Sequence, residues 1–66
     1  MLKMTEVRKS RGLSMSALAR RAEMHVSSIS QIESGHLVPY EKQVSKIAKA
    51  LNWEDDPKSL FVEVSR

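Results

Sequence analysis

The apolar residues of this 66-residue chain recur every three or four positions, which is the spacing of side chains that share one face of an α-helix. The clearest stripe has i, i+3, i+4, i+7 spacing and predicts a core-facing helix over residues 40–52. Its members are Val44, Ile47, Ala48 and Leu51. Strict alternation of apolar and polar residues occurs only near residue 62, so the pattern predicts an all-α fold.

The first helix is predicted over residues 4–11. Met4, Val7 and the stem of Arg11 are expected on its inward face. Gly12 is expected to end this helix, because glycine adopts the left-handed conformation that commonly follows a helix. Leu13 is then expected to enter the core.

A second helix is predicted over Met15–Ala22, with Ser14 as its N-cap, because a serine hydroxyl can accept a bond from a free N–H of the first turn. Its expected inward residues are Leu18, Ala19 and Ala22. The helix is predicted to end near Glu23, and Met24 places an apolar side chain in the turn that follows.

A third helix is predicted over Val26–Ser34, with His25 at the N-cap or in the preceding turn and Gly35 just past the end. Ile29 and Ile32 are expected to be buried. On a helical wheel the opposite side carries a stripe of polar residues with Val26 at its margin. The stripe consists of Ser27, Ser30, Gln31 and Ser34. Serine weakens a helix, so a face of this kind suggests that something approaches closely, and a DNA groove is one candidate.

The C-terminal part predicts a short fifth helix around Leu60 and Phe61, because Asp56 and Pro57 are typical of a helix start. Trp53 is expected to fill the junction between the fourth and fifth helices. Residues 62–66 are expected to form either a frayed tail or a short strand or apolar patch that joins two copies.

Size and composition restrict the function. A chain of this length forms one domain, residues 1–66, and buries only about 60% of its unfolded surface, which argues against a deep enzyme cleft. It has no Cys, and no run approaches the roughly 20 apolar residues that cross a bilayer. We therefore expect a soluble, cytoplasmic protein without catalytic activity.

The net charge of +3 is unevenly distributed. Residues 1–22 carry six basic side chains against one acidic, residues 23–41 carry three acidic and no Lys or Arg, and residues 42–49 add three lysines. The third helix, which has no Lys or Arg, is therefore flanked in sequence by basic segments. Such a surface attracts polyanions, although an ordinary solvated exterior fits a charge of +3 equally well.

In order and spacing, several segments of the chain resemble the lambda-repressor-like, Cro/XRE-type helix-turn-helix DNA-binding domains. These segments are "RKSRGLSMSALARRAEM", "SSISQIESG", Pro39 and "KIAKALN". The resemblance covers residues 4–61 and implies a compact five-helix domain in which the second and third helices form the helix-turn-helix.

The resemblance also implies roles for individual residues. The third helix is expected to lie in the major groove, with base contacts from Val26, Ser27, Ser30 and Gln31. Phosphate contacts are expected from helix N-termini and polar groups nearby, namely Ser14, Met15, Ser16, Ser34, His36, Lys42 and Lys46. Arg8 and Glu33 are expected to form a structural ion pair.

Two positions depart from the resemblance. Many relatives carry glutamine where this chain has Met15, so a side-chain bond to phosphate is lost and only the backbone N–H remains. Many carry glycine in the turn where this chain has Glu23, which is expected to strain that residue or alter the turn. Both changes bear on how tightly a single domain binds DNA.

Other chemistries have little support in the sequence. His25 and His36 are 11 residues apart without a third ligand at metal spacing, so no metal site is expected. The serines lack the partners of a hydrolase triad. No cofactor and no small-molecule ligand are expected.

The sequence thus predicts a sequence-specific, double-stranded DNA-binding regulator, a repressor or controller, that binds as a homodimer to half-sites about 34 Å or a multiple apart. The dimer contact is expected through the last helix and the tail. An alternative is a protein-interaction module, antitoxin-like or adaptor, with the same fold. A membrane-binding role is weaker, because no helix pairs a continuous lysine face with bulky apolar residues.

Overall fold

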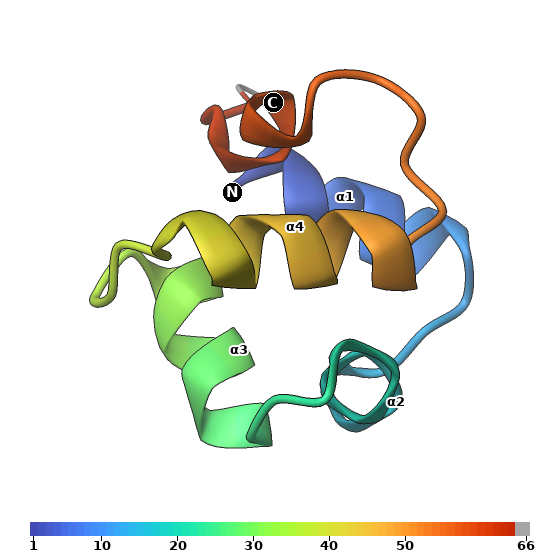
Figure 1. Cartoon of the computed structure of the whole chain (residues 1–66), viewed down its shortest axis with the longest axis vertical. Helices are drawn as coiled ribbons and strands as arrows, with labels where there is room; N and C mark the ends of the chain where they lie inside the picture. Colours follow the sequence, from blue (N-terminus) through green and yellow to red (C-terminus); the bar gives the residue numbers. More distant parts are fainter. Residues whose placement is uncertain (65–66) are drawn as a thin grey trace.

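Four α-helices and one 3-10 helix, joined by short loops, make up the part of the chain described by the computed structural model, residues 1–64 (Figure 1). The elements are α1 (Lys3–Ser10), α2 (Met15–Ala22), α3 (Val26–Ser34), α4 (Glu41–Ala50) and the 3-10 helix η1 (Pro57–Phe61). The bounds predicted for the second and third helices are confirmed. The fourth helix is shorter at both ends than its predicted range of 40–52.

The prediction of five α-helices is wrong, because the fifth element is a 3-10 helix of five residues. Its backbone bond runs from Ser59 N to Asp56 O, an i+3 to i bond that closes a tighter turn than an α-helix. The predicted start is confirmed, because Asp56 caps Lys58 N and Pro57 is the first residue of the turn. Val62 is already extended, so the segment is too short for a regular α-helix.

All four α-helices end in the same way. A residue with positive φ follows each helix, and the N–H of the next residue bonds to a carbonyl five positions back, which closes a Schellman motif. The four positive-φ residues are Gly12, Glu23, Gly35 and Asn52. Because these reversals are tight, the helices fold back on one another within 64 described residues.

The core lies between α2, α3 and α4, with α1 and η1 closing its other side (Figure 1). Its fully buried large side chains come from all five elements or their immediate flanks: Met4, Leu18, Ile29, Ile32, Ile47, Leu51 and Leu60. The inward residues predicted for α2 and α3 are buried, while Leu13, Met24 and Trp53 are partly buried against the cluster.

The expected inward position of Arg11 is wrong. Helix α1 ends at Ser10, so Arg11 lies in the turn and its side chain is exposed. Arg8, one turn earlier, is buried instead, with 7% of its surface exposed.

The C-terminal tail pairs with the N-terminus of its own chain. Leu2 and Glu63 form an isolated antiparallel β-bridge, flanked by bonds from Lys3 N to Val62 O (2.9 Å) and from Val64 N to Met1 O (2.7 Å). Residues 62–64 therefore pair within the chain through a single β-bridge, and the strand or patch expected to join two copies stays a prediction. Residues 65–66 lie outside the described part.

Candidate nucleic-acid interface

Helix α3 is fixed to the core on one side only. Ile29 and Ile32 are buried to 0% and 1% exposure, and they hold α3 against α2 and the rest of the core. In Figure 1, α2 is seen end-on while α3 lies across the view, so the two helices cross steeply after a turn of residues 23–25. Small Ala19 and Ala22 are buried on α2, which allows this close crossing.

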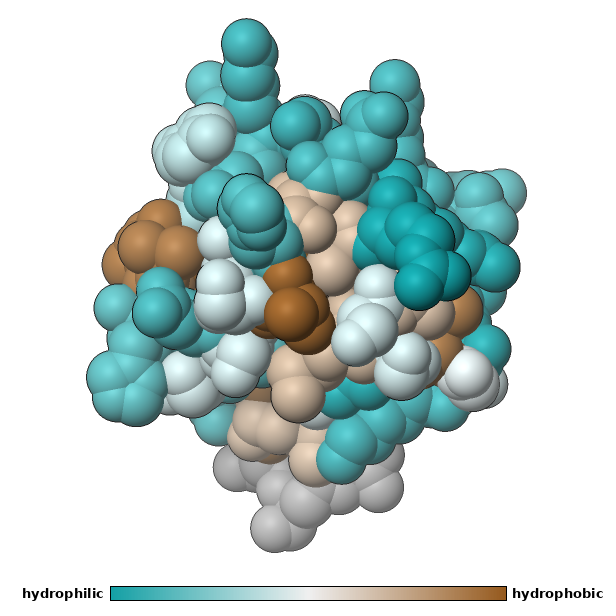
Figure 2. Space-filling model, turned by 90° about the horizontal axis from the view of Figure 1, so that it is seen from below, coloured by the Kyte–Doolittle hydropathy of each residue, from teal (hydrophilic) through white to brown (hydrophobic). Residues whose placement is uncertain are grey.

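The outer face of α3 consists of Ser27, Ser30 and Gln31, with Val26 beside them. The three polar side chains are exposed and make no hydrogen bond within the described part of the chain. Val26 is 46% exposed. Figure 2, which views the molecule from the side of α2 and α3, shows pale and apolar groups at the centre of this surface and hydrophilic groups around them. The donors and acceptors of α3 are therefore available to a ligand.

The C-terminal end of α3 carries a local polar pair. Ser34 Oγ lies 3.1 Å from Gln31 O, to which it donates, and 2.7 Å from His36 Nδ1. Both side chains are exposed. This pair orders the His36 ring at the C-terminal end of α3. The sequence predicts that Ser34 and His36 contact phosphate.

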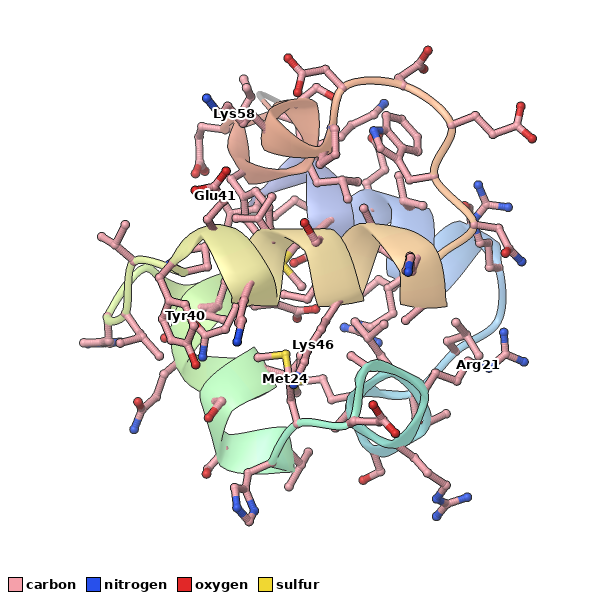
Figure 3. The ribbon with its side chains drawn as sticks, viewed as in Figure 1. Arg21, Met24, Tyr40, Glu41, Lys46 and Lys58 are labelled. Atoms are coloured by element: carbon pink, nitrogen blue, oxygen red, sulfur yellow. The ribbon has the colours of Figure 1, made fainter. Side chains whose placement is uncertain are left out.

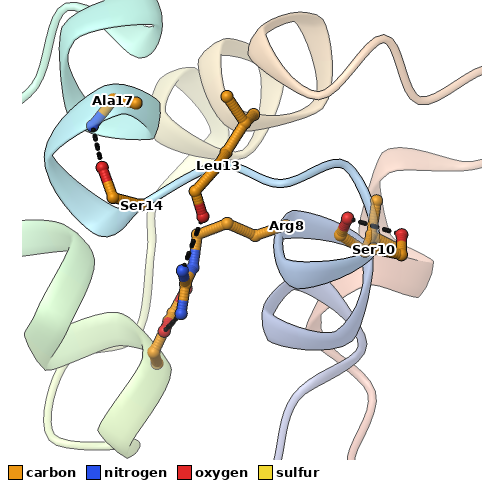
Figure 4. Close-up of polar contacts among 7 residues, drawn as sticks. Arg8, Ser10, Leu13, Ser14 and Ala17 are labelled. Atoms are coloured by element: carbon orange, nitrogen blue, oxygen red, sulfur yellow. Dashed lines mark hydrogen bonds and ion pairs between the residues drawn. The ribbon is translucent and has the colours of Figure 1, made fainter.

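The N-terminus of α2 presents Ser14, Met15 and Ser16, all exposed. Ser14 Oγ accepts a bond from Ala17 N at 3.0 Å, so the predicted N-cap is confirmed (Figure 4). The hydroxyl hydrogen of Ser14 is left for another acceptor. Met15 is 37% exposed and offers only its backbone N–H to an anion.

The two lysines predicted to contact phosphate are one turn apart on α4 and together line a groove of α4 residues, but only Lys46 also lines a groove at the helix-turn-helix. Lys46 lines a groove with Met24, His25 and Ser28, close to the start of α3 (Figure 3). Lys42 is exposed in a second groove, which is lined only by residues of α4. The fold therefore brings Lys46 to the helix-turn-helix, with Lys42 one turn away on α4 and outside that groove.

Apart from Lys46, the sequence assigned none of the residues that line this groove to the site; they are Glu23, Met24, His25, Ser28, Tyr40 and Gln43. Tyr40 is 64% exposed and is the N-cap residue of α4, with its N–H donating to Gln43 Oε1 at 3.2 Å. In the sequence, the feature that could have indicated a role for Tyr40 in the site is its position directly after Pro39 and before an amphipathic helix. Its nearness to α3 depends on the packing of α4 across the turn, which local sequence does not encode.

Arg8 and Glu33 form the ion pair assigned to them. Arg8 Nε donates to Glu33 Oε2 at 2.8 Å and Nη2 to Oε1 at 3.2 Å, while Nη1 donates to Leu13 O at 2.8 Å (Figure 4). Both side chains are only 9% exposed. A two-bond Arg–carboxylate contact of this kind fixes orientation, so it sets the position of α3 relative to α1.

The described residues offer no cluster of metal ligands. Within residues 1–64, no group of three or more His, Asp or Glu side chains stands close enough to hold a metal ion. His25 occupies the N-cap position of α3 without a side-chain capping bond. None of the helices in this part has the length and apolar character of a membrane span.

Two short helices that cross steeply after a three-residue turn, with the second exposed along its polar face, define a helix-turn-helix protein. A family model described as Helix-turn-helix matches residues 4–55. The chain therefore belongs to the Cro/XRE-type helix-turn-helix family of DNA-binding regulators. No curated protein and no solved structure gives a match.

Proposed function

We propose that the protein binds operator DNA sequence-specifically as a homodimer, with α3 in the major groove, and represses or controls transcription there. The observation that carries this proposal is the exposed, uncharged outer face of α3, whose Ser27, Ser30 and Gln31 side chains have no partner within the described chain. The major groove of DNA admits an α-helix and presents a distinct set of donors and acceptors for each base pair.

The side chains on this face suit base edges. Gln31 offers an amide that can bond N6 and N7 of adenine together, Ser27 and Ser30 can bond several bases, and Val26 can pack on a thymine methyl group. None of them adds charge, so in this proposal α3 supplies selectivity and its surroundings supply attraction to the phosphates.

The surroundings contain the proposed phosphate contacts. They comprise the exposed N-terminus of α2, the pair at the end of α3 and two lysines of α4: Ser14, Met15, Ser16, Ser34, His36, Lys42 and Lys46. Lys46 is the best supported of the lysines, because it lines a groove with residues at the start of α3. Backbone N–H groups at the start of α2 have no partner within the helix, so they add partial positive charge that attracts a phosphate.

The dimensions of one copy support the proposal of a homodimer. The longest principal axis of the described chain is 28 Å, which is less than the roughly 34 Å between successive major grooves on one side of a duplex. One copy therefore reads one half-site. Two copies related by a two-fold axis read a palindrome and exclude other proteins from the DNA they cover, which is the basis for proposing repression.

The proposal is tested by selecting bound duplexes from a random pool with the wild-type chain. We expect a palindromic motif with half-sites one helical turn or a multiple apart. The selected duplex should then shift the backbone amide resonances of residues 26–34. If these resonances do not move with any duplex, the DNA-reading role of α3 is wrong.

Salt separates DNA binding from the alternative of a protein-interaction module. Binding to DNA should weaken steeply with ionic strength, with log K falling by about 0.9 per neutralised phosphate for each unit of log salt. A transcription assay on a promoter that carries the selected motif tests the regulatory outcome. Expression should fall when the protein is present.

A further inference from the structure

The C-terminal end of α3 holds a hydrogen-bonded chain of three groups. His36 Nδ1 lies 2.7 Å from Ser34 Oγ, and Ser34 Oγ donates to the carbonyl oxygen of Gln31 at 3.1 Å. The other ring nitrogen of His36, Nε2, has no partner within residues 1–64, and the side chain is exposed. One side of the imidazole is therefore held by α3, and the other side is open to a ligand.

The protonation state of the imidazole decides which bonds this chain can make. A neutral imidazole has one N–H, on Nδ1 or on Nε2, whereas an imidazolium has both. With the hydrogen on Nδ1, the ring donates to Ser34 Oγ, and Nε2 presents a lone pair. With the hydrogen on Nε2, the Ser34 hydroxyl has to turn from Gln31 O to Nδ1, so the bond to Gln31 is lost. Only the imidazolium donates to Ser34, keeps the bond to Gln31 and offers an N–H outward.

A DNA phosphate accepts hydrogen bonds and carries a negative charge. It is repelled by a lone pair on Nε2 and attracted by an N–H of a cationic ring, because charge-assisted hydrogen bonds are about twice as strong as neutral ones. The phosphate contact proposed for His36 is therefore strongest when the ring is protonated. Histidine is the side chain whose charge ordinarily changes between about pH 5 and pH 8.

No charged neighbour already holds the His36 ring within residues 1–64. Glu33, the acidic residue of α3, is bound by Arg8 of α1. Other titratable side chains near the loop after α3 lie on α4, at its N-cap or on η1: Tyr40, Glu41, Lys42 and Lys58. None of them forms an ion pair or side-chain hydrogen bond with His36 in this part of the chain. The open side of the ring is thus available to an anion from outside the chain.

We infer that DNA binding takes up a proton at His36, so that the protein binds DNA more tightly as the pH falls. Ser34 is the positioning residue, because its hydroxyl holds Nδ1 inward and leaves Nε2 outward. The inference rests on the proposed function, since it needs a phosphate beside His36. The complex binds more protons than the free protein, so affinity rises on acidification while free His36 is neutral and levels off once free His36 is charged.

The dependence of DNA binding on pH is the first test. For one copy on a duplex with a single half-site, affinity should rise by about tenfold from about pH 8 to about pH 5.5. H36Q should remove this rise and bind over the whole range as weakly as the wild type does at the upper limit, because the glutamine amide stays neutral. Fluorescence anisotropy at constant ionic strength measures both proteins.

His25 provides the matched control. It is the other histidine of the chain, exposed at the N-cap of α3 and without a side-chain capping bond. H25Q should keep the full rise on acidification. H36K should bind more tightly than the wild type at the upper pH limit and show little rise, because lysine stays charged over this range. If H36Q keeps the rise, or H25Q loses it, the inference is overturned.

A second measurement tests the role of Ser34 without relying on affinity. NMR spectra of the ¹⁵N-labelled histidine rings report which ring nitrogens carry hydrogen. At neutral pH, addition of the half-site duplex should increase the protonated fraction of the His36 ring. S34A should reduce this increase, because a neutral ring can then turn an Nε2 hydrogen to the phosphate while water bonds Nδ1. Proton uptake by S34A equal to that of the wild type would overturn the role given to Ser34.

The same titration separates this inference from the proposed function. If the duplex shifts the amide resonances of residues 26–34 at both pH limits with equal affinity, only the proton uptake at His36 is wrong. If no duplex shifts these resonances at either limit, the proposed function fails, and the inference fails with it.

Discussion

Glu23 occupies a backbone conformation that suits glycine. Its φ of 56° and ψ of 46° place it in the left-handed region at the end of α2, where the helix ends of α1 and α3 carry glycine and that of α4 carries Asn52. This conformation costs a residue with a Cβ about 1–2 kcal/mol, and asparagine less. The turn of the helix-turn-helix therefore contains local strain at Glu23.

Replacing Glu23 by glycine should relieve this strain. After allowing for the greater freedom of glycine in the unfolded chain, E23G should raise the free energy of unfolding by about 0.5–1 kcal/mol. Urea unfolding followed by circular dichroism measures the change. N52G is the control and should change stability less. A less stable E23G would show that the Glu23 side chain contributes contacts that outweigh the strain.

Gln31 is the residue on which base discrimination should depend most. Its exposed amide has no partner among the described residues. Q31A should weaken binding to the selected duplex by about 1–3 kcal/mol and leave binding to random DNA nearly unchanged. Fluorescence anisotropy with both duplexes measures the difference. Equal losses on the two would remove Gln31 from the base-reading residues.

At the scale of elements, a buried ion pair between side chains far apart in sequence adds to the isoleucine packing that holds α3 in place. Arg8 on α1 binds Glu33 on α3 and the carbonyl of Leu13 in the intervening loop. R8M would leave the Glu33 carboxylate buried without a partner, and the cost should be about 3–5 kcal/mol. Thermal and urea unfolding measure the loss.

The double variant R8M/E33L separates the pairing from the charge burial. It removes both charges and replaces them with apolar groups of similar size, so it should recover most of the stability lost in R8M. If the double variant is less stable than R8M, the pair itself contributes net stability. That result would contradict the expectation that the cost of burying the two charges offsets their attraction.

Local start and stop signals decide which helices can be predicted from the sequence. Helices α2 and α3 have local start and stop signals, Ser14 and Gly35 among them, and their bounds are predicted correctly. The fifth helix fails as a prediction because Asp56 and Pro57 mark a start but not a helix type. The length of η1 is set by Val62, whose backbone pairs with Lys3 across the chain.

One part of the candidate site can be predicted from local sequence, and the other part depends on how the helices pack. A helical wheel predicts the outer face of α3 from the two buried isoleucines alone. The position of Lys46 next to the start of α3, and the separation of Lys42 from it, depend on how α4 packs across the turn.

At the scale of the whole molecule, affinity for DNA must come largely from groups outside α3, because α3 has no Lys or Arg. Each phosphate neutralised by a lysine releases counterions and steepens the dependence of binding on salt. Lys46 stands beside the start of α3 in each copy, so a dimer would use it twice. The salt slope therefore measures whether Lys46 reaches the backbone of the duplex.

K46A should reduce the slope of log K against log salt by about 2 for a dimer, one for each copy, and should weaken binding to selected and random DNA alike. K9A is the matched control, since Lys9 is exposed on α1 and does not line the groove that contains Lys46. It should leave the slope unchanged. If K46A and K9A change the slope equally, diffuse positive charge attracts the DNA, and the contact assigned to Lys46 is wrong.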